Sequence, residues 1–251
     1  MRSACGGRGQ LARPARSRYV RRSAGVVTLL ITAIAALAAP PTATAGDKVP
    51  LGGGAGIVVN GGPPCTLATI GHDMAGALVG ITSSHCGGPG ANVAFGPVGN
   101  VGTVVTANGE LDYAVIKFDP GKVAPVANFD GFAINSVGPF PAFGQWVCEQ
   151  SSATGNQCSY ITIPNHNPAF VSVHGCRNPD DQGAPVTSGD VLVGMIVNWG
   201  PENSPPCPFY NIPGSRRFNI TLDARLVSIT AITDDVNAKG GPGAGYSPIP
   251  A

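Results

Sequence analysis

The chain has 251 residues, of which only 12% are charged, and it is rich in glycine (36) and proline (24). This composition is typical of loop-rich β proteins and excludes a coiled coil or a helical bundle. From Gly46 onward, eight Lys and Arg residues stand against fourteen Asp and Glu residues, a net charge of −6. No basic surface remains there for a nucleic acid, so we do not expect nucleic-acid binding.

Residues 1–45 are predicted to be an export signal. Seven arginines and no acidic residue precede an apolar run over 25–39, and Ala43-Thr44-Ala45 supplies the small residues at which a signal peptidase cuts. The alternative is an uncleaved membrane anchor, but the apolar run is shorter than the about 20 residues that span a bilayer. We therefore expect a secreted or cell-envelope protein that is not held by the membrane after cleavage.

From residue 46 onward the chain is predicted to be all-β. Short β-branched and aromatic runs are separated by Gly, Pro or Asn turn signals, and no long 3.6-residue period occurs. The expected strands span 56–59, 77–82, 101–106, 113–118, 146–147, 159–163, 170–173 and 191–197. Many short strands of this kind predict a sandwich or a barrel, with a junction between two strand groups near 120–141.

The C-terminal part contains the single predicted helix, over 221–232, because Leu222, Leu226 and Ile229 fall on one helical face. The residues from 238 to 251 are rich in Gly and Pro and carry almost no bulky apolar residue. We expect them to form a loosely packed or disordered tail after a globular domain of residues 46–237.

Six cysteines remain once the leader, with Cys5, is set aside. They are Cys65, Cys86, Cys148, Cys158, Cys176 and Cys207. An even number in an exported chain predicts three disulfides, although six cysteines allow 15 pairings and spacing alone selects none. A zinc site would require close pairs such as CxxC or HExxH, which are absent from the sequence. We expect neither a metal nor another cofactor.

Two polar residues beside apolar strands are candidates for acid–base chemistry. His85 ends an apolar run, next to a cysteine that would fix its loop, and Asp112 begins another apolar run. A histidine base held in one tautomer by a buried carboxylate is what a hydroxyl nucleophile requires. The plain structural alternatives are a histidine that caps a turn and a strand-edge acid that accepts local backbone hydrogen bonds.

Several blocks together resemble the chymotrypsin-like serine peptidases of the secreted bacterial branch. TSSHC at 82–86 is similar to the family's TAAHC or TAGHC, and DYAV at 112–115 to its DxAL or DYGI run. Residues 147–158 resemble its V-C-x-x-G-x-T-T-G-x-x-C loop. Residues 176–186 resemble its C-x-x-x-G-D-S-G-G-P-V nucleophile loop, and 193–200 the strand that ends in SWG. The blocks follow the family's order.

The resemblance implies a fold and a set of site residues. The fold would be two six-stranded antiparallel β barrels with the site between them and a short C-terminal helix. The base would be His85 and its orienting carboxylate Asp112. The implied disulfides are Cys65–Cys86, Cys148–Cys158 and Cys176–Cys207. The residues implied to line the substrate cleft are Asn198, Trp199 and Gly200.

The nucleophile loop departs from the family pattern at three places. Gln182 holds the nucleophile position, and an amide has no oxygen that ionises near neutral pH. The oxyanion-hole positions are Asp180 and Gln182, and Asp180 replaces a glycine with a negative charge that opposes the transition state. Glu149 stands where bacterial relatives have an arginine that pairs with the aspartate matching Asp181, so two carboxylates would repel or share a proton. Arg177 is a possible compensating cation.

These departures predict a monomeric pseudo-peptidase that binds a peptide or protein ligand without cleaving it. Ser188 is not expected to replace the nucleophile, because it is predicted to lie in a hairpin turn that leads away from His85. The alternative is an active serine endopeptidase with an unrecognised nucleophile, and a third possibility is an exported β domain without a functional cleft. The sequence leaves open whether the chain is an enzyme.

Overall fold

The computed structural model describes residues 48–164, 168–173, 179–197 and 224–250. All of them belong to one compact unit that runs from Thr44 to Ala251. Several predictions fall outside the described residues: the export signal, Cys176, Arg177, Cys207, and the cleft residues Asn198, Trp199 and Gly200. No helix within these described ranges has the length and apolar character needed to cross a bilayer.

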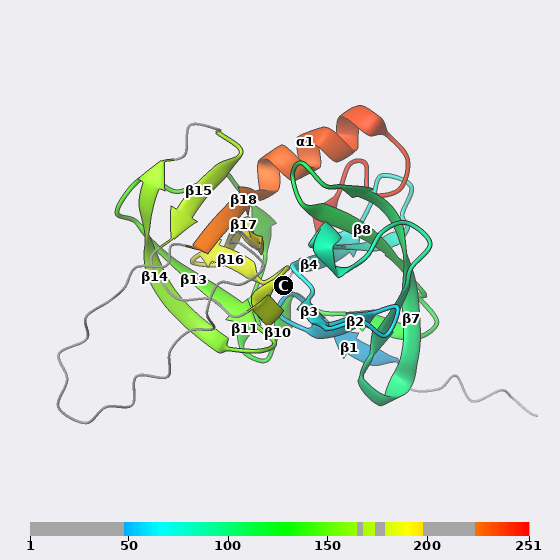
Figure 1. Ribbon diagram of the computed structural model, residues 1–251. Helices are drawn as coiled ribbons and strands as arrows, with labels where there is room; N and C mark the ends of the chain where they lie inside the picture. Colours follow the sequence, from blue (N-terminus) through cyan, green and yellow to red (C-terminus); the bar gives the residue numbers. More distant parts are fainter. Residues whose placement is uncertain (1–47, 165–167, 174–178, 198–223, 251) are drawn as a thin grey trace, which may run out of the picture. The chain divides into compact units, whose positions relative to one another are not determined.

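Two large β-sheets make up this unit, and Figure 1 shows them as two groups of strands with the helix α1 above both. The first sheet has the strand order β19-β4-β5-β8-β7-β6-β2-β3. Its strands are β2 (Gly56–Val59), β3 (Pro64–Thr66), β4 (Thr69–His72), β5 (Leu78–Thr82), β6 (Asn92–Phe95), β7 (Gly99–Asn108), β8 (Tyr113–Phe118) and β19 (Ser247–Pro248). The helix α1 spans Ile229–Lys239.

The second sheet has the order β12-β17-β16-β13-β14-β15-β18, and a further pairing of β17 with β18 closes six of its strands into a barrel. Its strands are β12 (Ser136–Val137), β13 (Trp146–Ser151), β14 (Gly155–Pro164), β15 (Phe170–Val173), β16 (Pro185–Ser188), β17 (Val191–Val197) and β18 (Ala224–Ser228). The six barrel strands are antiparallel to their neighbours.

The first sheet curls so that its two ends approach each other, because the stretch 64–72 contributes a strand near each end. β3 pairs with β2 and β4 pairs with β5. Between them, the Leu67 N–H donates to the Ala55 carbonyl and the Ala68 N–H donates to the Ile81 carbonyl, both at 2.8 Å. Together with the closed second sheet, this arrangement confirms the predicted two-barrel all-β fold.

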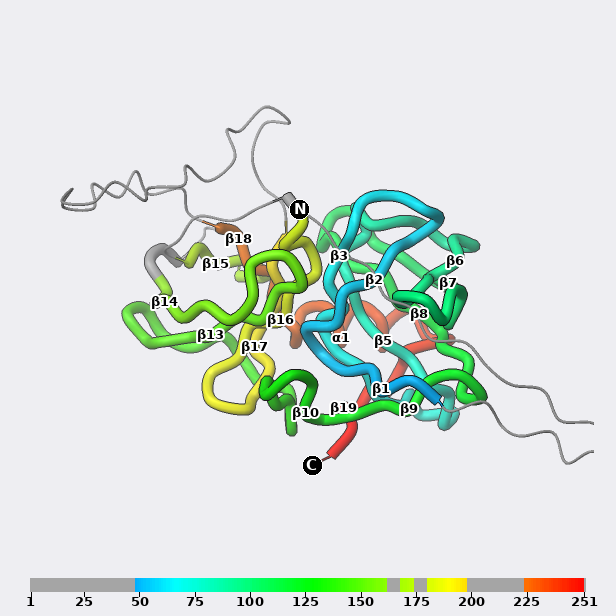
Figure 2. The backbone as a smooth tube through the Cα atoms, turned by 90° about the horizontal axis from the view of Figure 1, so that it is seen from below, coloured from blue at the N-terminus to red at the C-terminus, as the bar shows by residue number. Residues whose placement is uncertain are grey.

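Four short strands join the two sheets or lie at their margins. β1 (Val49–Leu51) runs parallel to β9 (Val123–Pro125), and the two lie side by side in Figure 2. β10 (Asn128–Phe129) and β11 (Phe132–Ala133) form a small hairpin. All four except β1 fall in the stretch 120–141 that was predicted to be the junction.

The apolar core has one cluster inside each barrel and a third between them. The third cluster combines Val79 and Tyr113 of the first sheet with Met195 and Val227 of the second, and Ile232 of α1 packs on the same cluster. β8 therefore buries both of its faces, which explains its nearly continuous apolar sequence YAVIKF. Burial at this junction fixes the ends of β5 and β8 relative to the second barrel.

The C-terminal helix begins later than predicted. Residues 224–228 are the strand β18, which closes the second barrel, and α1 begins only at Ile229. The Ser228 hydroxyl accepts the Ala231 N–H at 3.3 Å and caps the helix. The helical spacing of Leu226 and Ile229 was misleading because a short apolar segment fits either period, and here barrel closure selects the strand.

The predicted loose tail is also wrong for residues 240–250, which pack against the first sheet. β19 pairs with β4, so that Ser247 lies opposite His72. The hydroxyls of Tyr246 and Thr69 are 2.6 Å apart. A Cβ atom at Gly71 would meet the Ser247 carbonyl oxygen at 2.0 Å, so this contact requires glycine. The small residues that suggested disorder permit a close approach instead.

Candidate functional site

The histidine and the aspartate predicted to act together lie next to each other. β5 and β8 are antiparallel neighbours with Thr82 opposite Ala114, so the end of one strand meets the start of the other. His85 lies in a 3₁₀ turn, η1 (Ser84–Cys86), directly after β5, and Asp112 directly precedes β8. The His85 Nδ1 atom is 2.7 Å from Asp112 Oδ1. The sheet register thus joins two residues that are far apart in the sequence.

Asp112 is buried and its Oδ1 atom accepts several hydrogen bonds. The hydroxyls of Ser83 and Ser84 each donate to Oδ1 at 2.8 Å, and the His85 backbone N–H donates at 3.2 Å. Oδ2 is buried and has no hydrogen-bond partner among the described residues. The Asp112 backbone has a φ of 50°, a left-handed conformation that is uncommon outside glycine. The surrounding contacts hold this conformation in place.

Sequence reasoning missed the two serines that bind this carboxylate. The family motif TAAHC has alanines where this chain has Ser83 and Ser84, and an alanine cannot donate a hydrogen bond. The substitution was visible in the sequence as two small polar residues beside the histidine. Without the sheet register, their hydroxyls could not be assigned to Asp112, because that residue lies nearly thirty positions further along the chain.

His85 presents its second nitrogen away from Asp112. The bond at Nδ1 favours the tautomer in which Nε2 is an acceptor. The imidazole side chain is 56% exposed, whereas the Asp112 side chain is 8% exposed. Within the parts of the chain that the structure describes, no hydroxyl oxygen forms a hydrogen bond with Nε2. The pair can accept a proton, but no hydroxyl in these parts stands ready to give one.

Gln182 approaches this pair from the second barrel. Its side-chain oxygen Oε1 lies 3.4 Å from the Ser83 hydroxyl, and its backbone carbonyl accepts the Thr66 N–H at 2.9 Å. The next residue, Gly183, has a φ of 84°, and a Cβ atom there would meet the Thr66 carbonyl oxygen at 2.1 Å. Glycine at 183 therefore allows the loop to bring residue 182 next to Ser83 and, through it, to Asp112.

The buried Asp181 is bound by hydroxyl groups. Its Oδ1 atom accepts a hydrogen bond from the Ser151 hydroxyl and one of 2.8 Å from the Thr154 hydroxyl. Ser151 stands where the V-C-x-x-G-x-T-T-G-x-x-C motif has its glycine, so this chain adds a donor to the loop. Glu149 is also buried, on β13 opposite Val186. The sequence pattern suggested only charged partners for Asp181, and these hydroxyls were not predicted.

Asp180 and Ser188 lie on either side of the same loop. Asp180 is the middle residue of a 3₁₀ turn, η3 (Pro179–Asp181), directly before Gln182. Ser188 ends β16, opposite Val191 of β17, in the hairpin that was predicted for it. Ser188 therefore lies at the opposite end of β16 from the loop that carries Gln182.

Two of the three predicted disulfides are confirmed. Cys65 is bonded to Cys86, which anchors the η1 turn that carries His85 to β3. Cys148 is bonded to Cys158 across the β13–β14 pair. The third predicted bond, between Cys176 and Cys207, lies outside the described residues.

A cation of the second barrel acts on Asp112 electrostatically. The Arg225 guanidinium of β18 lies 3.5 Å from the centre of the Phe170 ring. Burial lowers the pKa of Arg225, and the charge of Asp112 opposes that shift. Neither Arg225 nor its partner ring was identified from the sequence.

The fold is that of the chymotrypsin-like serine proteases. Among solved structures, the chain is similar to Protease A of Thermobifida fusca, with a TM-score of 0.60, 15% identity, and coverage of 81% of this chain and 100% of that one. It is also similar to a Nocardiopsis protease (TM-score 0.57, 18% identity, 75% and 97% covered). For the chymotrypsin of Cellulomonas bogoriensis the TM-score is 0.57, with 22% identity and 81% and 100% covered.

The likeness to these bacterial proteases is a likeness of fold. A scan against protein families finds no match, and neither does a search of curated proteins. The activity of this chain must therefore be inferred from its own residues.

Proposed function

We propose that this chain is an exported, catalytically impaired homologue of the chymotrypsin-like proteases that binds peptide or protein segments in its cleft. The observation that carries the proposal is the side-chain amide of Gln182, located 3.4 Å from the Ser83 hydroxyl beside the His85–Asp112 pair. In the resemblance stated above, this is the place of the attacking serine. An amide there gives the imidazole no hydroxyl proton to accept.

The chemistry of the site supports binding over turnover. Peptidases of this type that lose the nucleophile keep only about 10³- to 10⁴-fold acceleration over water, which comes from the oxyanion hole and from binding. Asp180 stands at one of the two oxyanion-hole positions and brings a negative charge to it. This negative charge would also oppose the polarisation of a substrate carbonyl.

Ser83 donates to Asp112 and also lies next to Gln182, but it is unsuited to replace the missing nucleophile. It is fully buried, and its proton is donated to Asp112 Oδ1 at 2.8 Å. A substrate carbonyl would have to enter the core to reach it. Its position favours a structural link between Asp112 and Gln182.

The alternative, an active serine endopeptidase, is favoured by one observation: the half-exposed His85 is oriented by Asp112 as a working base would be. A fluorophosphonate probe separates the two functions, because it labels only an activated nucleophile. We expect no labelling of the purified chain. Labelling that disappears in a His85→Ala variant would contradict the proposal and establish the alternative.

Ligand binding is tested separately on a peptide array. We expect a subset of peptides to bind, and we expect Gln182→Arg to weaken their binding because a larger, charged side chain would fill the cleft beside Ser83. The surface variant Asp190→Asn, in the β16–β17 turn, is the matched control. Absence of any peptide binding would indicate an exported β domain without a functional cleft.

Export and a monomeric state belong to the same proposal. The two disulfides support an oxidising destination, because such bonds persist mainly outside the cytosol. Expression in a bacterial host should release into the medium or envelope a product that begins near Gly46. Sedimentation of that product should give the mass of one chain. Retention of residues 1–45 or a dimeric mass would contradict these points.

A further inference from the structure

Positive charge is concentrated around β8 of the first sheet and the start of the β1–β9 pair. The described residues include five lysines and arginines, against eleven aspartates and glutamates. Three of these five, Lys48, Lys117 and Lys122, line two pockets that share Lys117 and Phe118. This gathering of cations in an acidic unit lies apart from His85 and Gln182, neither of which lines either pocket. No part of the proposed function uses it.

One of the two pockets, which we name the rim-lysine pocket, combines an apolar floor with a cationic rim. Its volume is about 290 Å³, and it lies between the β4–β5 turn, the end of β8 and β9. Leu78, Phe118 and Val123 form the floor and are at most 5% exposed. The rim carries Lys48, His72 and Lys117. The pocket is close to the lower size limit of small-ligand sites.

The basic side chains of this rim are not engaged by hydrogen bonds or ion pairs within the described chain. Lys48, His72 and Lys117 form no hydrogen bond or ion pair through their side chains among the described residues. Other lysines are engaged: Lys122 donates to the Asn100 carbonyl at 2.8 Å, and Lys239 pairs with Asp235 at 2.6 Å. These side chains are therefore available to an anion, although Lys117 also attracts the nearby Asp73 and helps to lower the pKa of that carboxyl.

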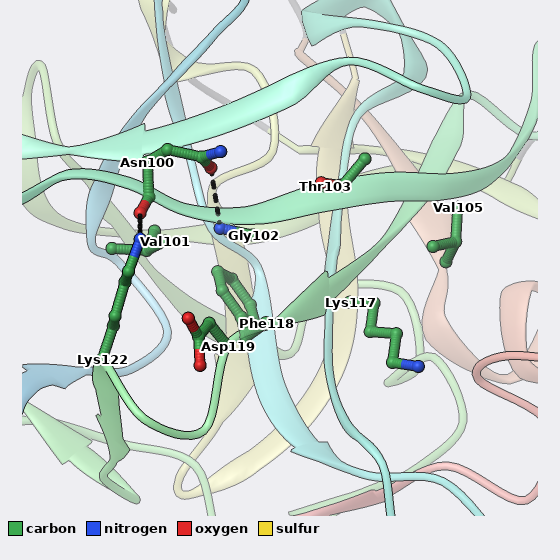
Figure 3. Close-up of a pocket in the computed structure, with 9 residues that line it drawn as sticks. All are labelled: Asn100, Val101, Gly102, Thr103, Val105, Lys117, Phe118, Asp119 and Lys122. Carbon is green, nitrogen blue, oxygen red and sulfur yellow. Dashed lines mark hydrogen bonds between the residues drawn. The ribbon is translucent and has the colours of Figure 1, made fainter.

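The neighbouring acids do not cancel this charge. The Asp73 carboxylate is nearly buried and accepts the N–H groups of Ala75, Ala77 and Gly243 at 2.9 to 3.2 Å. Asp119 lines the second pocket, not this one. In Figure 3 the Lys122 side chain runs to Asn100, whereas Lys117 extends away from both. Lys117 lines both pockets and is not bonded to Asn100, whereas Lys122 lines only the other pocket and is bonded there.

We propose that the rim-lysine pocket binds a carboxylate that is attached to a small apolar group, as in the C-terminal residue of a peptide that ends in leucine. The apolar side chain would pack on Leu78, Phe118 and Val123, where it leaves water. The carboxylate would accept charge-assisted hydrogen bonds from Lys48 and Lys117, with His72 as a further donor. The same chemistry occurs where an acidic side chain adjoins an apolar one within a peptide.

The first experiment uses N-acetyl-leucine as the probe and follows backbone amide shifts by NMR. We expect Ala77, Leu78 and Phe118 to shift, with a dissociation constant of about 1 mM. N-acetyl-leucinamide lacks the charge and N-acetylglycine lacks the apolar side chain, so each should bind at least about fivefold more weakly. Equal binding of the acid and the amide would overturn the proposal, as would shifts confined to residues around His85 and Gln182.

Substitutions on the rim test which lysines act. Lys48→Gln and Lys117→Gln should each weaken N-acetyl-leucine binding about fivefold, since each removes one exposed charge. Lys122→Gln is the matched control and should bind as the parent does. A loss of similar size in all three variants would indicate unspecific attraction and overturn the proposal. Thermal melts of the variants show that they are folded.

A second pair of probes distinguishes the sources of the carboxylate. One peptide ends in a free C-terminal leucine, and the other is amidated and carries glutamate next to an internal leucine. Tighter binding of the first assigns the pocket to chain ends, and tighter binding of the second assigns it to internal acidic segments. Failure of both would overturn the proposal, while the fluorophosphonate and Gln182 experiments would be unaffected.

Discussion

The two barrels contribute unequally to the candidate site. The first barrel supplies an ordered His85–Asp112 pair at 2.7 Å, with two serine hydroxyls added to the carboxylate. The second barrel supplies a loop whose backbone is bonded to Thr66 and whose side chain at 182 is an amide. The position of the loop therefore does not depend on the chemical group that residue 182 carries. Under the proposed function, the first barrel keeps a base in position although the second barrel offers it no hydroxyl to activate.

The largest expected effect tests whether the first barrel is still competent. Gln182→Ser combined with Asp180→Gly should raise hydrolysis of an activated ester by about 10³-fold over the parent, because a hydroxyl and an uncharged oxyanion position are restored together. Initial rates with a chromogenic substrate measure the gain. Adding His85→Ala should abolish it. No gain in a folded double variant would show that the first barrel has also lost its function.

A second prediction concerns the contact between the loop at 182–183 and Thr66, where the barrels meet at the site. Gly183→Ala should lower the free energy of unfolding by about 3 kcal/mol or more, because φ is 84° and the new Cβ would lie 2.1 Å from the Thr66 carbonyl oxygen. Urea denaturation measures the loss. Gly189→Ala is the control: its φ is 66° but its Cβ faces open space, so a loss of only about 1 kcal/mol is expected.

A third prediction concerns the hydroxyls that bind Asp181 in the second barrel. Ser151→Ala should cost about 2 kcal/mol of stability, since a buried carboxylate loses a charge-assisted hydrogen bond. Chemical denaturation at neutral pH provides the value. Ser159→Ala, on β14, is a control with no such partner among the described residues. If Ser151→Ala is as stable as the parent, the hydroxyl does not compensate for a missing ion pair.

The smallest predicted effect depends on pH and concerns Asp235, through which α1 contacts the first barrel. Burial raises the pKa of Asp235, but hydrogen bonds from Lys239, Tyr113 and Asn108 outweigh it and lower the pKa to about 2. A lowered pKa means that the stabilisation is complete above about pH 4 and is lost as the pH falls towards 2. Asp235→Asn should therefore cost about 1–2 kcal/mol at pH 6 and almost nothing at pH 2.

Melting temperatures of the parent and of Asp235→Asn over this pH range test that prediction. Asp234→Asn removes the neighbouring, exposed carboxylate and should follow the parent. A constant difference between the parent and Asp235→Asn from pH 6 to pH 2 would contradict the assigned hydrogen bonds.

The sequence predicted those features that depend on local pattern. The strands at 113–118, 170–173 and 191–197 have the predicted bounds, because β-branched runs between turn signals define them. His85 and Asp112 were selected by their place at strand ends, and strand pairing brings them together. The Cys65–Cys86 bond followed from the resemblance and could not have been chosen by spacing.

What the sequence could not predict depends on contacts between distant segments. The segment 224–228 is a strand because it completes a barrel, a requirement that its own residues do not reveal. Ser83 and Ser151 bind carboxylates 29 and 30 positions away, and such pairings require the sheet register. The rim-lysine pocket likewise unites residues from Lys48 to Pro125, none of which forms a recognisable motif.

The two residues of β19 cover the outer edge of the first sheet. They occupy the outer side of β4, where unpaired N–H and C=O groups would otherwise invite a strand from another molecule. Pro248 has no N–H of its own, so the new outermost strand is a poor template for further addition. A chain shortened to Lys239 would lose this cover and should aggregate through the first sheet, and a purification tag is therefore safer ahead of residue 46 than after residue 251.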